Sequence, residues 1–223
     1  MTTLGPYDLN TIITGDAREL AKAIPDESVD LIFTDPVYDR IEDYRWLAET
    51  AARVLKPEKS VLAFAWTPEL RKILYATEVL HYHGIASLYI SNRTKDTRNQ
   101  WGFNKWTPLI WLSRGDAKSP RTADLIQCKA FHSNIYSNGS SNHMWSKPPE
   151  FIAHYIQKFT KTGDIIFEPF TGGGTVPAVC KMLQRDYLAF EIDPATANMA
   201  RKRVAETQPP LPIVYHEQME LLT

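Results

Sequence analysis

The stretch SVDLIFTDPVYD, residues 28–39, joins a strand-length apolar run to a carboxylate, a proline and a tyrosine. The run VDLIFT is rich in β-branched and aromatic side chains, which predicts a buried strand over residues 29–34. Pro36 cannot continue an interior strand, so the chain is expected to turn at Asp35. An Asp-Pro turn at a strand end is common in α/β proteins and by itself indicates no function. The stretch therefore predicts an α/β sheet with Asp35, Pro36 and Tyr38 where a strand ends.

Strand-length and helix-length segments alternate on both sides of this stretch, which is the pattern of a mostly parallel sheet covered by helices. We expect further strands at residues 9–14, 60–66, 84–91, 105–113, 164–170 and 186–193. We expect helices at residues 44–55, 67–80, 148–159, 176–183 and 195–206. A short helix follows Asp16, its expected N-cap. Pro108, within the strand at 105–113, indicates a sheet edge or a bulge. Periodicity disappears between Arg114 and Ser146, so we expect an insertion there and no core element.

A glycine triplet follows the predicted strand at 164–170, in the segment FEPFTGGGT at residues 167–175. Glycines at a strand-to-helix turn let the backbone approach a ligand, and the following helix offers unpaired N–H groups. About 20 residues later the next strand reaches Glu191, a position from which a carboxylate binds ribose hydroxyls. The alternative is an ordinary tight turn and a solvated acid. The combination favours a nucleoside cofactor, whereas the glycine spacing matches neither a dinucleotide fingerprint nor a P-loop.

Length and composition are those of a globular chain of 223 residues, 43% of them apolar. The sequence has no apolar run of about 20 residues and no secretion signal, so we expect a cytoplasmic protein that does not contact a membrane. Cys128 and Cys180 are too few for a disulfide framework or a thiolate zinc site. His81 and His83 have no evident ligand partner in the sequence. We therefore expect no metal.

The net charge of −1 conceals a basic segment. Residues 91–147 carry nine Lys or Arg and three Asp, a net charge of +6, whereas the rest of the chain carries −7. Cations and aromatic side chains alternate within 92–106, a mixture that suits phosphate contacts and base stacking. A single charge is often only part of a solvated face. The residues that we expect at a nucleic-acid surface are Arg93, Lys95, Arg98, Trp101, Lys105, Arg114 and Arg121.

Together, these motifs resemble those of the DNA amino-methyltransferases that use S-adenosylmethionine, in their circularly permuted β arrangement. Asp35, Pro36, Val37 and Tyr38 match the catalytic motif (D/N/S)PP(Y/F/W) of that family. The segment FTGGG matches its FxGxG cofactor loop, and Glu191 matches its acid at a strand end. The catalytic motif comes first, followed by an insertion, a Lys-Pro pair and the glycine loop, which is the β order.

The resemblance implies a Rossmann-like class I methyltransferase fold, an α/β fold with a mostly parallel seven-stranded sheet and helices on both faces. It divides the chain into a catalytic half at 1–113, an inserted target-recognition region at 114–146, a cofactor-binding half at 147–208 and a tail at 209–223. The implied cofactor is S-adenosylmethionine. The implied catalytic residues are Asp35, Pro36 and Tyr38. The residues implied at the cofactor are Asp16, Ser146, Lys147, Glu168, Phe170, Gly172, Gly174, Thr175 and Glu191.

The reaction implied by the resemblance is methyl transfer to N6 of adenine in DNA, on a base flipped out of the duplex. Within the family, Asp at the first motif position favours adenine; N4 of cytosine is the alternative, and adenine in RNA is a weaker one. Val37 departs from the second proline of the motif, so a catalytically impaired protein that binds cofactor and nucleic acid is a further alternative. Because the recognition region is small, a homodimer that shares the duplex also fits.

Overall fold

The structure is a computed structural model of the chain, and it describes residues 2–90, 106–118, 125–128 and 147–208. The predicted residues Ser146, Arg93, Lys95, Arg98, Trp101, Lys105 and Arg121 lie outside the described ranges. None of the helices in the described ranges has the length and hydropathy of a membrane span.

One mixed sheet dominates the described residues, with eight strands in the order β3-β10-β9-β4-β5-β7-β6-β8. The strands are β3 (Thr11–Thr14), β4 (Val29–Thr34), β5 (Leu55–Phe64), β6 (His81–Ile90), β7 (Trp106–Ser113), β8 (Leu125–Cys128), β9 (Ile165–Glu168) and β10 (Asp186–Glu191). Strands β3, β10, β9, β4 and β5 run parallel, and β7 runs antiparallel between β5 and β6. The predicted α/β class with a mostly parallel sheet is confirmed.

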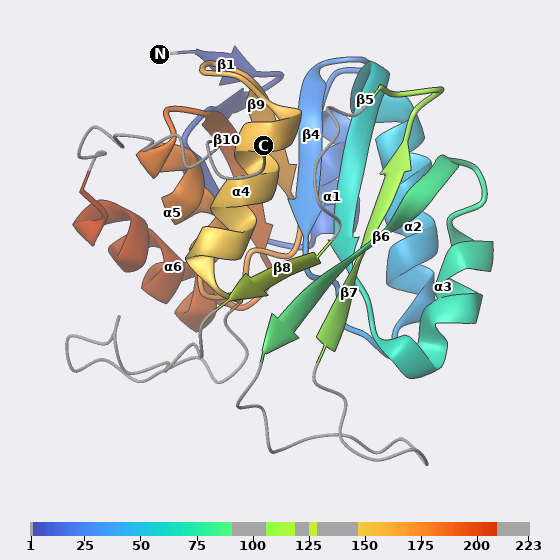
Figure 1. Cartoon of the computed structure of the whole chain (residues 1–223). Coiled ribbons are helices and arrows are strands. Elements are labelled where there is room, and N and C mark those ends of the chain that lie inside the picture. Colours follow the sequence, from blue (N-terminus) through green and yellow to red (C-terminus); the bar gives the residue numbers. More distant parts are fainter. Residues whose placement is uncertain (1, 91–105, 119–124, 129–146, 209–223) are drawn as a thin grey trace, which may run out of the picture.

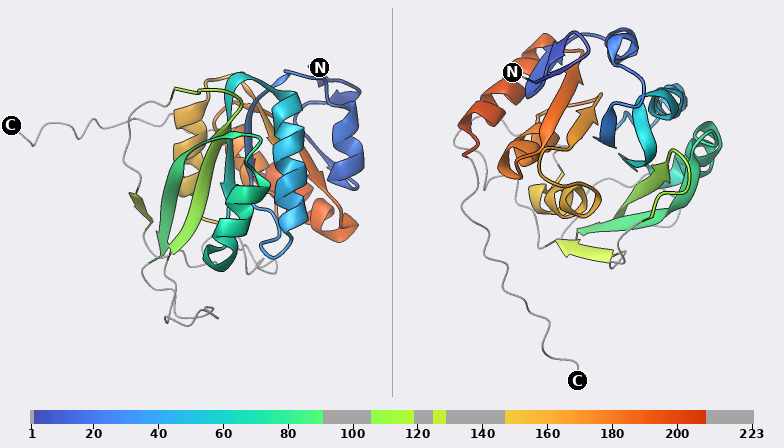
Figure 2. Two further views of the ribbon diagram at one scale, coloured as in Figure 1. Left: turned by 90° about the vertical axis from the view of Figure 1, so that its right-hand side faces the viewer. Right: turned by 90° about the horizontal axis from the view of Figure 1, so that it is seen from above.

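Helices cover both faces of the sheet (Figures 1 and 2). One face carries α1 (Ala17–Leu20), the 3-10 turn Ala21–Ala23, α2 (Ile41–Val54), the 3-10 turn Thr67–Glu69 and α3 (Leu70–Ala76). The other face carries α4 (Pro149–Phe159), α5 (Thr175–Met182) and α6 (Pro194–Glu206). Each layer buries its own apolar cluster against the sheet, so the molecule has three layers.

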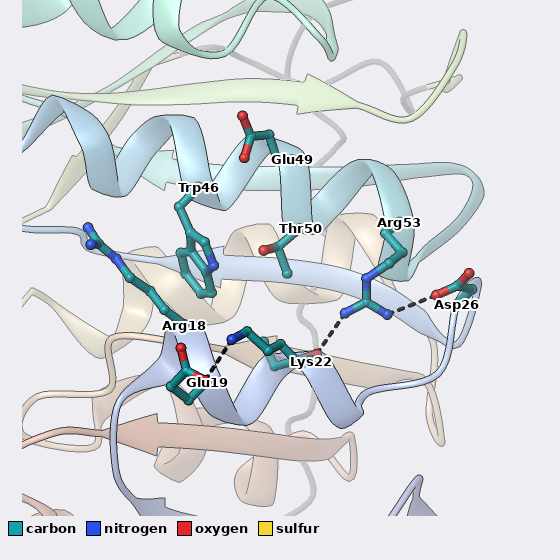
Figure 3. A pocket seen from close by; sticks show the side chains of 9 residues that line it. Arg18, Glu19, Lys22, Asp26, Trp46, Glu49, Thr50 and Arg53 are labelled. Atoms are coloured by element: carbon teal, nitrogen blue, oxygen red, sulfur yellow. Dashed lines mark hydrogen bonds and ion pairs between the residues drawn. The ribbon is translucent and has the colours of Figure 1, made fainter.

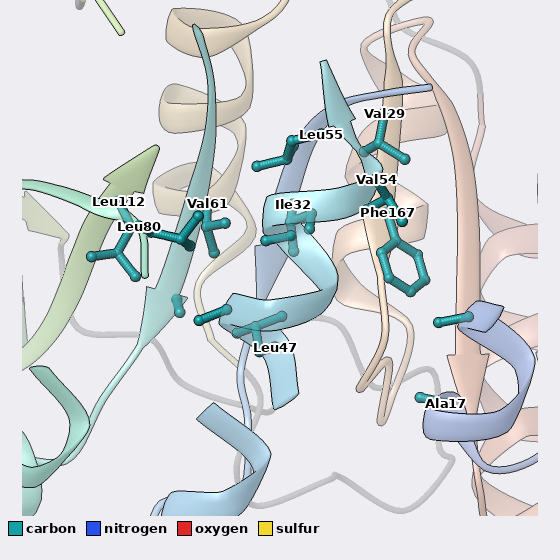
Figure 4. Close-up of a cluster of buried hydrophobic side chains, with 14 of the residues drawn as sticks. Ala17, Val29, Ile32, Leu47, Val54, Leu55, Val61, Leu80, Leu112 and Phe167 are labelled. Carbon is teal, nitrogen blue, oxygen red and sulfur yellow. The ribbon is translucent and has the colours of Figure 1, made fainter. Parts of the chain in front are cut away.

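Strand β4 shows how its apolar run serves both layers. All six of its residues are buried. Ile32 packs into the cluster under α1, α2 and α3, part of which Figure 4 shows, whereas Leu31 and Phe33 pack into the cluster under α4, α5 and α6. A strand covered on both faces needs apolar side chains at every position, which explains a continuous run in place of an alternating pattern. The predicted strand at 29–34 is confirmed.

Three features of the fold differ from the sequence-based expectations. Pro108 lies in an interior strand, with its carbonyl accepting a hydrogen bond from Ala65 N at 2.9 Å. The nitrogen of Pro108 points to the same side as this carbonyl, where the pairing of β5 with β7 ends. The proline therefore costs one hydrogen bond at the end of the ladder and does not interrupt it. The insertion contributes β8, which pairs with β6 from Ser87 to Ile90. A hairpin of β1 (Thr3–Leu4) and β2 (Tyr7–Asp8) was also not predicted.

The strand order places a topological switch point between β4 and β9 (Figure 1). From β4 the chain continues through α2 to β5 on one side, whereas from β9 it continues through α5 to β10 on the other. In open α/β sheets, the carboxyl ends of the strands at such a point form a crevice for ligands. The expected site is therefore where β4 and β9 end.

Candidate active site at the carboxyl edge of the sheet

The predicted site residues that the structure describes converge on this carboxyl edge, with the exception of Arg114. Asp35 follows the end of β4, Glu168 ends β9 and Glu191 ends β10. Because β9 lies between β4 and β10, the glycine loop after β9 lies between the other two strand ends. A cavity of 260 Å³ opens at this point. Its lining consists of Phe33, Thr34, Asp35, Phe64, Lys147, Ile152, Glu168, Phe170, Thr171, Gly172, Gly173, Thr175 and Val176.

The carboxylate of Asp35 has two unequal oxygens. Oδ2 forms an ion pair with the Nζ of Lys147. Oδ1 is buried and has no hydrogen-bond partner among the described residues. A buried polar atom without a partner costs free energy, and beside a cavity such an atom is a candidate acceptor for a ligand. Asp35 therefore lines the cavity with one acceptor, Oδ1, that has no partner among the described residues.

Lys147 lies inside the site, and its side chain is only 14% exposed. Its Nζ is 5.2 Å from the ring centroid of Tyr38 and 4.8 Å from that of Phe64. Both distances are within the range of cation–π attraction. The lysine thus connects the segment before α4 with the turn after β4, 112 residues earlier in the chain. The family resemblance implied that Lys147 lies at the cofactor; its pairing with Asp35 was not predictable, because no local pattern relates the two residues.

Glu168 links the two strand ends from below the cavity. Its side chain is buried, and its Oε1 accepts hydrogen bonds from Thr34 Oγ1 at 2.6 Å and from Phe170 N at 3.2 Å. Burial raises the pKa of Glu168 to about 8, with further contributions from the nearby carboxylates of Asp35 and Glu191. At neutral pH the group is therefore mostly protonated. It holds Thr34 and the glycine loop without adding a third negative charge to the site.

The carboxylate of Glu191 is held by two backbone N–H groups. Gly172 N donates to its Oε2 at 2.8 Å, and Asp193 N donates to its Oε1 at 3.0 Å. Gly172 has a φ of +50°, and a Cβ built on it would meet no atom within 4 Å. The loop thus exposes backbone beside the acid, as a cradle for a ligand requires.

The packing demands a glycine at position 174. It has a φ of +76° and directly precedes α5. A Cβ at this position would lie 2.8 Å from the Cβ of Ala200 in α6. Both the left-handed backbone and the close approach of α6 therefore exclude larger residues. The predicted Thr175 begins α5 and lines the cavity.

Two further residues support the loop and were missed by sequence analysis. Arg203 of α6 donates hydrogen bonds to the carbonyl of Gly173 at 2.9 Å and to Thr175 Oγ1 at 2.7 Å. The ring of Trp46 in α2 lies edge-on to that of Phe170, with 5.6 Å between centroids. In the sequence, Arg203 is one of several cations in a helix and is indistinguishable from a solvated charge. Only the packing of α6 on the loop reveals its role.

Asp16 has the predicted role of helix N-cap, since its Oδ1 accepts a hydrogen bond from Arg18 N at 2.9 Å. The side chain is exposed, and the preceding Gly15 N donates to the carbonyl of Glu191 at 2.9 Å. Asp16 thus lies next to the strand end that carries Glu191. Its position is compatible with a second role at a ligand beside that acid.

A larger crevice of 630 Å³ lies between α1 and α2 (Figure 3). Four of its charged residues pair with each other, Lys22 with Glu19 at 2.6 Å and Arg53 with Asp26 at 2.8 Å, and Arg18 pairs with Asp43. Paired surface charges of this kind have little attraction left for a ligand. The chemistry-bearing residues at the strand ends line the smaller cavity, which is the better candidate site despite its size.

Arg114 lies far from these strand ends. It follows β7 at the amino end of β5, and its guanidinium donates to the carbonyl of Leu55 at 2.6 Å and to Glu27 Oε1 at 2.7 Å. These bonds hold a turn at the opposite edge of the sheet. Arg114 is therefore left out of the nucleic-acid surface that we propose below.

Comparison with known proteins gives consistent similarities. The sequence profile of a family described as DNA methylase matches residues 86–202. The type II methyltransferase M.HinfI of Haemophilus influenzae is 27% identical, in an alignment that covers 90% of this chain and 70% of that protein. The solved M1.HpyAVI-SAM complex has a TM-score of 0.73 at 21% identity and covers 87% of this chain and 98% of that one. The cytosine-N4-specific PvuII DNA methyltransferase has a TM-score of 0.75 at 16% identity and covers 91% and 87%. At these identities, the two solved structures establish the fold.

Proposed function

We propose that this chain, which belongs to the DNA methylase family because the family profile matches more than half of its residues, methylates N6 of adenine in DNA. The family membership makes it a DNA methyltransferase, and its cofactor is S-adenosylmethionine. The family contains enzymes that act on N6 of adenine and others that act on N4 of cytosine. Our proposal therefore concerns the choice of base and the residues that carry the reaction.

The observation that carries the proposed mechanism is the unpaired, buried Oδ1 of Asp35 beside the cavity of the glycine loop. An exocyclic amino nitrogen is a poor nucleophile because its lone pair is delocalised into the ring. Two acceptors, Asp35 Oδ1 and the carbonyl of Pro36, would bind its two hydrogens and favour a pyramidal nitrogen with a directed lone pair. The Lys147 ion pair fixes the carboxylate through its other oxygen. Tyr38 would supply a face on which the flipped base stacks.

The described residues fit S-adenosylmethionine. Glu191 would accept hydrogen bonds from the ribose hydroxyls, as carboxylates at strand ends do in nucleoside sites. The open backbone at Gly172 gives the ligand room to approach, and Phe170 lines the same cavity. When bound, the cofactor supplies a methyl group on a sulfonium sulfur, which keeps the bonding electron pair as the methyl group leaves. The chain itself contributes orientation of the amino group and acceptors for its protons.

Val37, at the third motif position, does not remove either proposed acceptor. The residue is 48% exposed, and its carbonyl accepts a hydrogen bond from Arg40 N at 3.1 Å. The segment after Asp35 therefore closes as a turn without the second proline. This geometry favours a working enzyme over the alternative, a protein that binds cofactor and DNA without turnover.

Replacing Glu191 by glutamine is expected to weaken S-adenosylmethionine binding by roughly 10- to 100-fold, because hydrogen bonds to a charged group contribute about 1.5–3 kcal/mol. The amide also cannot accept from both Gly172 N and Asp193 N. Isothermal titration of both proteins with the cofactor measures the effect. Glu206→Gln is the matched control, because Glu206 is exposed and its ion pair with Lys202 is 3.8 Å long. Equal affinity of wild type and Glu191→Gln would remove Glu191 from the proposed cofactor site.

The choice of base is tested on the product. Unmodified DNA is incubated with the protein and labelled S-adenosylmethionine, digested to nucleosides and separated by chromatography with mass detection. We expect N6-methyl-2′-deoxyadenosine as the labelled nucleoside. N4-methyl-2′-deoxycytidine would favour the alternative that the PvuII enzyme represents, and binding of cofactor and DNA without any labelled product would favour the non-catalytic alternative.

DNA is the proposed macromolecular partner, and the predicted contact residues of the basic segment at 91–147, without Arg114, form its proposed contact surface. Its predicted contact residues, apart from Arg114, lie outside the described ranges and are proposed from the sequence. A homodimer that shares one duplex remains part of this proposal, because the recognition region between the two halves of the domain is short.

A further inference from the structure

A second cluster of chemistry-bearing side chains lies at the opposite edge of the sheet from Asp35. His81 and His83 are the first and third residues of β6, and Asp116 follows β7. His81 is paired with Ser113 across the β6–β7 ladder, which brings Asp116 back to the start of β6. In the sequence these histidines have no evident ligand partner, which led to the expectation of no metal. Asp116 comes close to them only through strand pairing.

The three side chains present ligand atoms to a common point. One nitrogen of each histidine and one carboxylate oxygen of Asp116 all lie within 4.8 Å of one another. His81 and Asp116 are exposed and His83 is half-buried, so an ion in solution can reach the group. Two imidazoles and a carboxylate form a donor set that suits Zn²⁺ and related transition-metal ions.

The tautomer of His83 is determined by its neighbours. Its Nε2 is 2.6 Å from Ser113 Oγ, and the Ser113 hydroxyl donates to the carbonyl of Gly115. A hydroxyl has one hydrogen, so Ser113 Oγ must accept from His83, and Nε2 carries the proton. Nδ1 is then the nitrogen with a free lone pair. Histidines that bind metals commonly donate their second N–H to an oxygen in this way.

The ring of His83 is also held in place by packing. It stacks on Trp111, with 4.1 Å between centroids and an angle of 14° between the planes. Trp111 in turn donates from its Nε1 to Ser60 Oγ at 3.0 Å and packs edge-on against Phe159 of α4. This support comes from two neighbouring strands and a helix, so the orientation of His83 is fixed before any ion binds.

The turn that carries Asp116 is anchored on both sides. Arg114 N donates to the carbonyl of Lys59 at 2.9 Å, and Glu58 N donates to the carbonyl of Arg114 at 2.8 Å. After Asp116, Ala117 is buried and its N–H donates to the carbonyl of Gly115 at 3.1 Å. The backbone that carries Asp116 is therefore held in place, whereas its side chain is exposed. Rotation of the exposed side chains of Asp116 and His81 would close the ligands on an ion.

We propose that His81, His83 and Asp116 form a binding site for one divalent transition-metal ion, with water completing the coordination. Zn²⁺ is bound by histidine at about 2.0–2.1 Å and by carboxylate at about 2.0–2.2 Å. A bound ion would join the beginning of β6 to the turn after β7. It would act as a clip at the edge of the sheet and take no part in methyl transfer.

The test uses the full chain after removal of metal by a chelator, with ZnCl2 as the probe. Isothermal titration is expected to show a site that is weakened at least about tenfold by His81→Ala, which removes one ligand of three, and by Asp116→Asn, which replaces a charged carboxylate by a weaker, neutral amide oxygen. Both residues are exposed, so both variants are expected to fold. Ser113→Ala keeps all three ligands but removes the hydroxyl that accepts from His83 Nε2 and thereby fixes its tautomer. About a tenfold loss of affinity is expected.

His154→Ala is the matched control, because it removes a histidine of α4 that does not belong to the cluster and should leave this site unchanged. Zn²⁺ is also expected to raise the melting temperature of the wild type and not that of His81→Ala, because a ligand that binds only the folded state stabilises it. Mg²⁺, which prefers oxygen ligands, should have no such effect. Zn²⁺ affinity that is equal in the wild type, His81→Ala and Asp116→Asn would overturn the proposal.

Discussion

Methyl transfer to DNA is expected to fall by about 10²- to 10⁴-fold when Asp35 is replaced by alanine, the range seen when a proton-accepting or charge-stabilising group is removed from an active site. In the proposed mechanism, Asp35 Oδ1 is one of two acceptors that direct the lone pair of the amino group. Its loss leaves the Pro36 carbonyl alone. The incorporation of labelled methyl groups into unmodified DNA measures the rate.

The binding of S-adenosylmethionine to this variant should change only a few-fold, because Asp35 is not proposed to contact the cofactor. Asp39→Ala is the matched control: it removes an exposed aspartate four residues further along the same segment. We expect this control to retain nearly full activity. If Asp35→Ala turns over like the wild type while folded, the assignment of Asp35 as a catalytic residue is wrong.

The second large effect is expected in the pH dependence of stability, and it arises from Glu168. Its pKa is raised from 4.5 to about 8 in the folded chain, mainly by burial. The folded state therefore holds the proton more tightly than the unfolded state. This contribution to stability is fully present below the unfolded pKa and is lost as the pH rises toward the folded pKa. Within that interval, the free energy of unfolding should fall by up to roughly 1.4 kcal/mol per pH unit.

Glu168→Gln removes this titration and keeps an oxygen that can accept from Thr34 and Phe170. Urea unfolding of the wild type and the variant is compared at about pH 6 and about pH 8. Over this span the stability of the variant is expected to rise by roughly 2 kcal/mol relative to the wild type. The comparison of the two proteins cancels the titration of other groups. Glu206→Gln, at an exposed position, should follow the wild type. Parallel stability curves for wild type and Glu168→Gln would show that Glu168 ionises alike in both states.

A neutral Glu168 also bears on the proposed chemistry. The site already holds the carboxylates of Asp35 and Glu191, of which only Asp35 is paired with a cation, Lys147, among the described residues. A third charge would raise the cost of burial there. A protonated Glu168 keeps its hydrogen bonds to Thr34 and to the loop without this cost. Ionisation of Glu168 at high pH is therefore expected to disturb the arrangement of Thr34 and the glycine loop around the cavity as well as the stability of the fold.

Much of the architecture was predictable because it is encoded in neighbouring residues. The buried strand at 29–34, the glycine turn and the helix that follows it are each specified by a local pattern of side chains. The order of the motifs then identified the family. Pro108 shows the limit of such rules, because a proline is tolerated in an interior strand where the ladder on its N–H side ends.

Pairings between distant segments were not predictable in the same way. The chain alone determined which residues end strands, which turns need glycine and which acids stand at strand ends, since periodicity and backbone sterics act over a few residues. Tertiary structure alone decided that Lys147 meets Asp35, that Arg203 holds the glycine loop, and that Arg114 serves a turn at the far edge. A charged side chain looks the same in a sequence whether it faces water, a partner or a ligand. Its partner is chosen only when strands far apart in the chain become neighbours.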